Sequence, residues 1–221
     1  MLNNDHLNKM VVFDMDNTLL RGRFIDECAE RFKFKQALSL LRQMEHDAAS
    51  MTIRIASFLK GQHKSALVDI AKTIQLTQGI ADVVKELKSR SYVVGIISDS
   101  YRLVTDYVAA QIDADFCLAN ELLYDGNYLT GEVSIPSYFQ YSKDSVCKHH
   151  VCKTNALRYA CNRYNTKLEN CMAVGDGEND ICMVRNAGLG IAFCTTNELL
   201  KNAAKQHIEE QKISDLLLYT F

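Results

Sequence analysis

The feature that most constrains this chain is a short apolar strand that ends in two acids. Met10 to Phe13 are apolar and partly β-branched, which predicts a buried strand of a parallel sheet. The chain continues directly into Asp14-Met15-Asp16-Asn17-Thr18. Because side chains alternate along a strand, Asp14 and Asp16 can point the same way just past its end, where open α/β sheets bind their ligands. A turn that caps the next helix is the alternative, since Asp, Asn and Thr favour such positions too.

The same layout recurs twice further along the chain. Cys171 to Val174 leads into Gly175-Asp176-Gly177-Glu178-Asn179-Asp180, and Tyr92 to Ile97 leads into Ser98-Asp99-Ser100. Lys153 adds a cation at the head of a helical segment. Acids, a hydroxyl and a lysine delivered by separate strand ends predict a site for phosphoryl transfer. A turn that happens to contain acids explains one such stretch, but it is a poor explanation for three, so the functional interpretation is favoured.

These motifs, in this order, resemble the four motifs of the haloacid dehalogenase (HAD) superfamily of phosphohydrolases. They are Asp14 to Thr18, Ile97 to Ser100, Lys153 and Gly175 to Asp180. The helical insert after the first motif, and the run from Ala173 to Asp180, are similar to the phosphoserine phosphatase branch. The resemblance covers nearly the whole chain. It implies a doubly wound parallel sheet (a HAD-like Rossmannoid core) with an inserted helical cap and a small β-hairpin flap.

The alternation of strand and helix patterns predicts the same α/β class. We expect a catalytic core of residues 1–20 and 79–221, with the cap inserted at 21–78. The insert has apolar residues at helical spacing and no strand signal, which predicts about four helices, with Gly61 between two of them. The hairpin is predicted at Glu121 to Val133, turned by its Asp-Gly pair. The remaining expected elements are helices at 79–90, 101–112, 142–164 and 180–186, and strands at 92–97, 115–118, 171–174 and 189–193.

The resemblance implies a covalent mechanism with a metal cofactor. Asp14 is the expected nucleophile and would form an aspartyl phosphate. Asp16 would protonate the leaving oxygen and later deprotonate the attacking water. Mg²⁺ is the expected cofactor, and Asp14, the main-chain carbonyl of Asp16 and Asp176 would bind it.

Other motif residues would bind or surround the phosphate. Ser98 would donate a hydrogen bond to a phosphate oxygen, with the main-chain amide of Asp99 assisting. Lys153 would balance the remaining negative charge as a compact cation. Asp180 is expected to orient Lys153 or a metal-bound water, and Asn179 to contact the phosphate.

Two arginines bear on the choice of substrate. Arg54 lies where the carboxylate-binding arginine of phosphoserine phosphatases falls, whereas Arg23 replaces the acid that would receive the serine ammonium in that branch. A cation at that position favours a second anionic group, although Asp26 or Glu27 can substitute for the missing acid. We therefore expect a small phosphomonoester as substrate, either phosphoserine or a similar small anionic metabolite.

Two alternatives remain open at this point. One is the same chemistry on a more anionic substrate, such as a sugar phosphate or a carboxylic acid phosphate. The other is a non-catalytic phospho-acceptor like a response-regulator receiver, which also has acids, a hydroxyl and a lysine at its strand ends. The long helical insert speaks against a receiver, whose connections are short.

Charge and composition argue against some classes of partner. A net charge of -2 and a pI near 6.3 give no general electrostatic reason to expect nucleic acid or an acidic membrane surface. No apolar run approaches the roughly 20 residues of a membrane span, and the first residues lack a secretory pattern. We expect a cytoplasmic enzyme without nucleic-acid or membrane partners, and the oligomeric state stays open.

The cysteines also bear on the compartment. The 8 cysteines are scattered through predicted helices and strands, which fits buried thiols in a reducing compartment better than a disulfide scaffold. The stretch Cys147-Lys148-His149-His150-Val151-Cys152 is a candidate zinc site. It lacks a second ligand pair at a familiar spacing, so structural thiols are the favoured interpretation.

Overall fold

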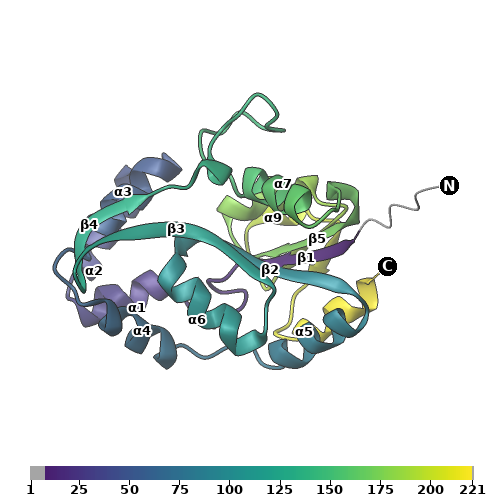
Figure 1. Cartoon of the computed structure of the whole chain (residues 1–221), viewed down its shortest axis with the longest axis horizontal. Coiled ribbons are helices and arrows are strands. Elements are labelled where there is room, and N and C mark those ends of the chain that lie inside the picture. Colours follow the sequence, from purple (N-terminus) through teal and green to yellow (C-terminus); the bar gives the residue numbers. More distant parts are fainter. Residues whose placement is uncertain (1–7, 221) are drawn as a thin grey trace.

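The computed structural model of the chain describes residues 8–220. Its centre is a 7-stranded sheet with the order β4-β3-β2-β1-β5-β6-β7 (Figure 1). The strands are β1 (Lys9–Phe13), β2 (Tyr92–Tyr101), β3 (Phe116–Asp125), β4 (Tyr128–Ser134), β5 (Cys171–Gly175), β6 (Leu189–Phe193) and β7 (Gln206–Ile208). Neighbouring strands are parallel except for the antiparallel pair β3 and β4. The expected α/β fold with a doubly wound parallel sheet is therefore confirmed, with one antiparallel edge.

Strand β1 lies at the centre of the sheet and is apolar on both faces. It pairs in parallel with β2 on one side and with β5 on the other. Val11 and Phe13 are buried in the core on one face of the sheet, whereas Met10 and Val12 are buried in the core on the other face. A strand covered on both faces needs such a continuous apolar run, and this explains the sequence that precedes Asp14.

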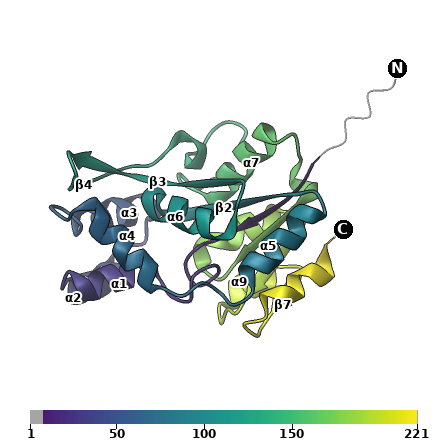
Figure 2. The same ribbon diagram turned by 60° about the horizontal axis from the view of Figure 1, so that its bottom comes forward.

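Helices cover both faces of the sheet (Figure 2). Helices α5 (Ile80–Ser89) and α6 (Arg102–Ile112) contribute to the first core, and α7 (Lys153–Arg163) and α8 (Ile181–Asn186) to the second. A short helix, α9 (Glu198–Ala203), packs beside α8. Within residues 8–220, none of the helices has both the length and the apolar character needed to cross a bilayer.

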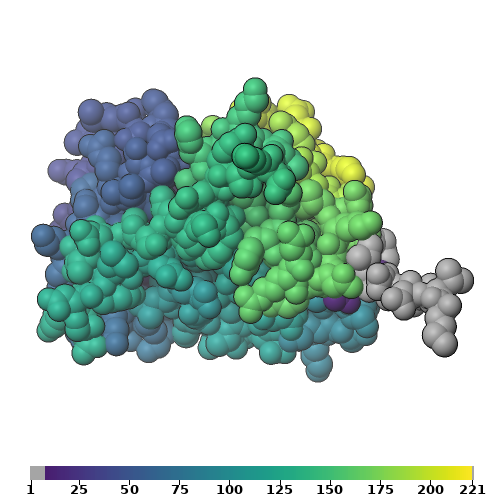
Figure 3. All heavy atoms as spheres, turned by 45° about the horizontal axis from the view of Figure 1, so that its top comes forward, coloured from purple at the N-terminus to yellow at the C-terminus, as the bar shows by residue number. Residues whose placement is uncertain are grey.

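Four helices between β1 and α5 lie together at one end of the molecule (Figure 1), and the atoms of this segment form that end of the surface in Figure 3. They are α1 (Phe24–Arg31), α2 (Lys35–Met44), α3 (Ala48–Ser57) and α4 (Lys64–Thr73). Gly61 lies between α3 and α4, as expected, and adopts a positive φ of 78° that favours glycine. The number of helices agrees with the sequence-based expectation, while the exact limits of the cap stay a prediction.

The cap helices are joined to the hairpin of β3 and β4 by backbone hydrogen bonds. The N–H of Gly61 donates to the carbonyl of Leu129 at 2.8 Å, and the N–H of Leu129 donates to Gln62 at 2.9 Å. The N–H of Lys64 donates to the carbonyl of Asn127 at 2.9 Å. The hairpin therefore supports the cap as well as extending the sheet.

Three elements differ in their limits from the sequence-based expectation. Strand β2 continues to Tyr101, and the strand expected at 115–118 runs on into the hairpin as one strand, β3. β3 changes from parallel pairing with β2 to antiparallel pairing with β4. Both strands, β2 and β3, thus continue beyond the apolar residues that predicted them, because they remain paired with a neighbouring strand. Helix α7 begins only at Lys153, because the mostly exposed residues 142–150 have no apolar face to pack.

Ile96 and Ile53 offer a matched test of the core. Ile96 on β2 is fully buried, whereas Ile53 on α3 is 52% exposed. Ile96→Ala should lower the free energy of unfolding by about 2–5 kcal/mol because it leaves a cavity, and Ile53→Ala should change it by less than about 0.5 kcal/mol. Urea denaturation followed by circular dichroism measures both values. Equal losses in the two variants would contradict this assignment of the core.

Candidate active site

Asp14 and Asp16 lie at the carboxyl end of β1. The N–H of Asp14 donates to the carbonyl of Val174 on β5 at 2.9 Å, and the Asp14 side chain is buried. Asp16 Oδ1 accepts a hydrogen bond from the N–H of Phe24, the first residue of α1, at 2.8 Å. Asp16 therefore links the central strand to the first cap helix, because it satisfies a free amide at that helix start.

Lys153 lies between two carboxylates at the centre of the site. Its Nζ is 2.5 Å from Asp14 Oδ1 and 2.7 Å from Asp180 Oδ1, and all three residues are buried. Burial by itself lowers the pKa of Lys153, but the charges of Asp14 and Asp180 more than offset this effect and hold the pKa well above the ordinary lysine value. Lys153 therefore stays a cation.

The loop after β5 is built around the Asp180 carboxylate. Asp180 Oδ2 accepts hydrogen bonds from the N–H of Asp176 at 3.1 Å and from the N–H of Gly177 at 3.0 Å. A Cβ on Gly175 would lie 2.5 Å from the Asp180 side chain, so only glycine allows this approach. Asp176 in turn accepts a hydrogen bond from Asn17 Nδ2 at 3.2 Å.

Three carboxylates converge here and leave an excess of negative charge. Oxygens of Asp14, Asp176 and Asp180 lie within 4.8 Å of one another, and Lys153 is the only cation among the buried side chains of residues 8–220. Burial, and then the charge of Asp180, raises the pKa of Asp14 and of Asp176. Hard oxygen donors that lack a compensating charge suit a divalent cation such as Mg²⁺. These residues therefore fit the cofactor expected from the sequence.

Asp16 has a pKa suited to proton transfer near neutral pH. Burial raises the pKa of its carboxyl to about 7, against the opposing effect of the hydrogen bond from Phe24. A group whose pKa lies near the working pH can both donate and accept a proton. This property is what the acid-base role expected for Asp16 requires.

Strand β2 brings a hydroxyl and a further acid to the same edge of the sheet. Ser98 is fully buried, and its Oγ accepts a hydrogen bond from the N–H of Ser100 at 3.1 Å. Asp99 Oδ2 accepts a hydrogen bond from Asn179 Nδ2 at 2.7 Å, and Asp99 Oδ1 is 3.9 Å from Lys153 Nζ. The structure thus brings together the four motifs that the sequence places at separate strand ends.

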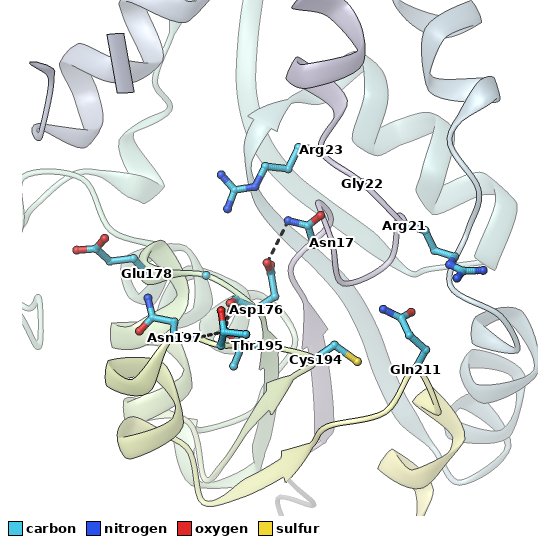
Figure 4. A pocket seen from close by; sticks show the side chains of 12 residues that line it. Asn17, Arg21, Gly22, Arg23, Asp176, Glu178, Cys194, Thr195, Asn197 and Gln211 are labelled. Atoms are coloured by element: carbon cyan, nitrogen blue, oxygen red, sulfur yellow. Dashed lines mark hydrogen bonds between the residues drawn. The ribbon is translucent and has the colours of Figure 1, made fainter. Parts of the chain in front are cut away.

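An open pocket of about 780 Å³ adjoins these acids (Figure 4). Arg23, which precedes α1, points into the pocket on the side of Asn17 and Asp176 (Figure 4). The pocket is lined by Asn17, Arg21, Gly22, Arg23, Asp176, Gly177, Glu178, Cys194, Thr195, Thr196, Asn197 and Gln211. A substrate in this pocket would therefore meet the guanidinium of Arg23 together with the carboxylate of Asp176.

The structure does not bring Arg54 to this pocket. Arg54 is exposed on α3, and its Nη1 is 3.5 Å from Glu45 Oε2. The two acids that can substitute for the missing ammonium partner also lie elsewhere: Asp26 is ion-paired at 2.7 Å with an arginine of α2, and both Asp26 and Glu27 line a different cavity. Of the two candidate arginines, only Arg23 lies beside the motif acids.

The sequence reasoning missed polar residues that follow β6. Thr195 Oγ1 donates a hydrogen bond to the carbonyl of Asp176 at 2.6 Å, and Asn197 Oδ1 accepts one from the N–H of Leu200 at the start of α9 at 3.0 Å. Both residues line the pocket. A signal was present, because Cys194-Thr195-Thr196-Asn197 follows a predicted strand in the way that the motif acids follow theirs.

Comparison with known proteins finds relatives over nearly the whole length of the chain. A sequence profile of haloacid dehalogenase-like hydrolases matches residues 11–185, a span that contains all four motifs. The phosphoserine phosphatase of Methanocaldococcus jannaschii is 30% identical over 216 residues, which are 96% of this chain and 97% of that protein. The phosphoserine phosphatase of Lactococcus lactis is 28% identical over 212 residues, which are 94% of this chain and 93% of that protein.

Solved structures agree with these sequence matches. A phospho-aspartyl intermediate analogue of phosphoserine phosphatase matches with a TM-score of 0.82 at 29% identity, covering 97% of this chain and 100% of that one. A substrate-bound phosphoserine phosphatase complex matches with a TM-score of 0.81 at 27% identity, covering 97% and 99%. The relatives are enzymes, which decides against the receiver-like alternative. The chain belongs to the haloacid dehalogenase-like hydrolase family and is a phosphatase of the phosphoserine phosphatase branch.

Proposed function

We propose that this phosphatase hydrolyses a small phosphomonoester, with phosphoserine as the first candidate, through an aspartyl phosphate formed on Asp14. The observation that carries the proposal is the buried Asp14 carboxylate, bound to Lys153, with Asp16 two positions further along the same strand end. Two kinds of relative support it. Several are named as phosphoserine phosphatases, and one solved structure represents a phospho-aspartyl intermediate analogue.

The proposed reaction has two steps. In the first, a carboxylate oxygen of Asp14 forms a bond to phosphorus while the bond to the leaving oxygen breaks, and Asp16 gives its proton to that oxygen. In the second, water attacks phosphorus, Asp16 takes the proton of that water, and Asp14 is released as phosphate leaves. Because the pKa of Asp16 is about 7, the same carboxyl can serve both steps.

Lys153 and Ser98 would bind the phosphoryl group in both steps. Lys153 remains charged because two carboxylates contact its ammonium, and Asp180 holds it in place. A fixed cation in a buried site stabilises developing negative charge without the cost of reorganising water. Ser98 lies at the same strand edge and would donate a hydrogen bond from its hydroxyl, with the amide of Asp99 beside it.

The carboxylates of Asp14 and Asp176, together with the main-chain carbonyl of Asp16, would hold Mg²⁺. When bound, the ion supplies positive charge that offsets the repulsion between the Asp14 carboxylate and the phosphate. The shortage of positive charge among the three clustered acids supports this assignment.

Arg23 favours a second candidate substrate within the same chemistry. Its guanidinium faces the pocket where a leaving group would lie, and guanidinium groups prefer planar anions over an ammonium. A sugar phosphate or a carboxylic acid phosphate without an amino group would meet this cation favourably. Arg54 stays a candidate for binding a substrate carboxylate on the strength of its position in the sequence alone.

Replacing the nucleophile tests the covalent step. Asp14→Asn should reduce kcat to about 10⁻³ of the wild-type value or less, since it removes the attacking oxygen's charge at almost constant volume. Phosphate release and the far-ultraviolet circular dichroism spectrum measure activity and folding. Asp113→Asn is the matched control, because Asp113 is an exposed residue at the end of α6 with a φ of 57° that asparagine tolerates. Substantial turnover by Asp14→Asn would refute the aspartyl-phosphate mechanism.

Metal removal tests the cofactor. Dialysis against a chelator should abolish phosphate release, and added Mg²⁺ should restore it. Ca²⁺ should restore little activity, because its longer bonds and higher coordination number disturb the alignment of the reacting groups. Undiminished activity in excess chelator would show that no divalent cation is needed.

Charge reversal at Arg23 tests the choice of substrate. Arg23→Glu would supply a partner for an ammonium, so it should raise kcat/KM for phosphoserine relative to a phosphorylated carboxylic acid that lacks the amino group. A charge-assisted hydrogen bond of about 1.5–3 kcal/mol corresponds to roughly a ten- to hundredfold change in that ratio. Arg163→Glu makes the same charge change at an exposed position on α7 and should leave the ratio unaltered. An unaltered ratio in Arg23→Glu would remove Arg23 from substrate selection.

A further inference from the structure

A second cluster of metal-ligand side chains lies outside the active site, where α7 begins. Cys147, His149 and Cys152 come from the loop between β4 and α7, and Cys182 comes from α8. One ligand atom from each of the four residues lies within 4.8 Å of all the others. In particular, Cys182 Sγ is 3.4 Å from His149 Nδ1. Three thiols and an imidazole from two separate segments therefore converge on one point.

The spacing of these atoms agrees with a tetrahedral zinc site. Zinc bonds of about 2.3 Å to sulfur and about 2.0–2.1 Å to nitrogen put tetrahedral ligands roughly 3.8 Å apart for two sulfurs and roughly 3.5 Å apart for sulfur and nitrogen. The distance between Cys182 and His149 is close to the second value. Cys152 is buried and Cys147 and Cys182 are half-buried, while His149 is exposed. Four protein ligands complete the coordination, as in structural zinc sites.

A disulfide accounts for this cluster less well. A disulfide joins two sulfurs at about 2.05 Å and would leave the third thiol and the imidazole without a reason to converge. The pair Cys161 and Cys171 provides a contrast within the same chain. Their Sγ atoms are 3.4 Å apart, and in the described part of the chain they belong to no metal-ligand group. Two neighbouring thiols can therefore occur in this fold without further metal ligands around them, which sets the four-residue cluster apart.

The loop that supplies three of the four residues has little else to hold it. It protrudes from the body of the molecule ahead of α7 (Figure 1), and its one large apolar residue between positions 142 and 150, Val146, is 48% exposed. The backbone hydrogen bonds that close it lie at its base, from Tyr141 to His150 at 2.8 Å and from Cys152 to Phe139 at 2.9 Å. A loop of this length without secondary structure or a core needs another source of order.

We propose that Cys147, His149, Cys152 and Cys182 bind a structural zinc ion. The three thiols lose their protons on binding and coordinate as thiolates, while His149 coordinates as a neutral imidazole through Nδ1. The ion joins the start of α7 to α8. From the sequence alone, structural thiols are favoured because the stretch lacks a second ligand pair at a familiar spacing. The folded chain supplies a fourth ligand, Cys182, from α8.

This position ties the zinc site to the active site without making it part of the chemistry. Lys153 directly follows Cys152, and α8 directly follows Asp180. Zinc would therefore fix the two backbone segments that deliver Lys153 and its partner Asp180. The Cys152 side chain makes no capping hydrogen bond to the first amides of α7; its thiol donates instead to Thr154 Oγ1 at 3.5 Å.

Cobalt substitution tests the proposal on the full chain. The reduced, metal-free protein is titrated with Co²⁺ in the presence of excess Mg²⁺, and then with Zn²⁺. We expect about one equivalent of Co²⁺ to produce intense visible bands and thiolate-to-cobalt charge transfer, and Zn²⁺ to remove them with a dissociation constant below roughly 100 nM. Carboxylate-bound cobalt absorbs only weakly, so the active-site acids do not give this signal. Absence of thiolate charge transfer would overturn the proposal.

Single substitutions assign the ligands. Cys182→Ser and His149→Ala should each weaken zinc binding at least about a hundredfold and lower the melting temperature of the zinc-loaded protein. His149 is exposed, so its variant keeps the fold even if Cys182→Ser does not. Cys117→Ser is the matched control, because Cys117 is a buried thiol outside the cluster that donates to Asp106 at 2.9 Å, as a serine hydroxyl can. Unchanged zinc affinity in His149→Ala, or a disulfide among these cysteines in place of bound metal, would refute the site.

Discussion

The structure depends on one buried cation that contacts two buried carboxylates. Lys153 bridges Asp14 at the end of β1 and Asp180 in the loop after β5. Removing three charges from water is costly unless each finds a partner at close range. Here the parallel sheet meets that condition, because neighbouring strands deliver both carboxylates to one edge and α7 begins beside it. The same contacts that make the burial tolerable also fix the positions of the residues proposed to carry out phosphoryl transfer.

Asp16 extends this arrangement from the core to the cap. Its carboxylate accepts the first amide of α1, so the group expected to transfer protons also anchors the cap's first helix. The turn between α3 and α4 is bound to the hairpin at Gly61 and Leu129. Arg21, Gly22 and Arg23 lie where the core leads into the cap, and all three line the pocket. Arg23 immediately precedes α1, so the position that departs from the phosphoserine phosphatase pattern also lines this pocket.

The fold brings together two groups of potential metal ligands of different chemistry. The hard carboxylate oxygens at the strand ends suit a hard cation such as Mg²⁺. The thiols and imidazole near α7 are softer ligands that suit zinc, and they lie where the loop has no hydrophobic core. Both groups lie at the starts of the same two helices. Lys153 and Asp180 of the active site begin α7 and precede α8, and Cys152 and Cys182 of the second group precede α7 and belong to α8. Order in the loop and order in the active site are therefore linked through the backbone.

Local sequence by itself determined the fold class, the strands that end in acids, and the helical insert. An apolar run followed by acids is a local pattern, and the sheet order then brings the strand ends that carry Asp14, Ser98 and Asp176 to one edge, where α7 begins with Lys153. The tertiary structure decided what depends on the packing of distant segments. Arg23 and Arg54 were both expected at the substrate, yet only Arg23 lies at the pocket, while Arg54 contacts an acid of its own cap. Likewise, no local spacing places a cysteine of α8 beside the loop before α7, because their meeting depends on how two helices pack on one face of the sheet.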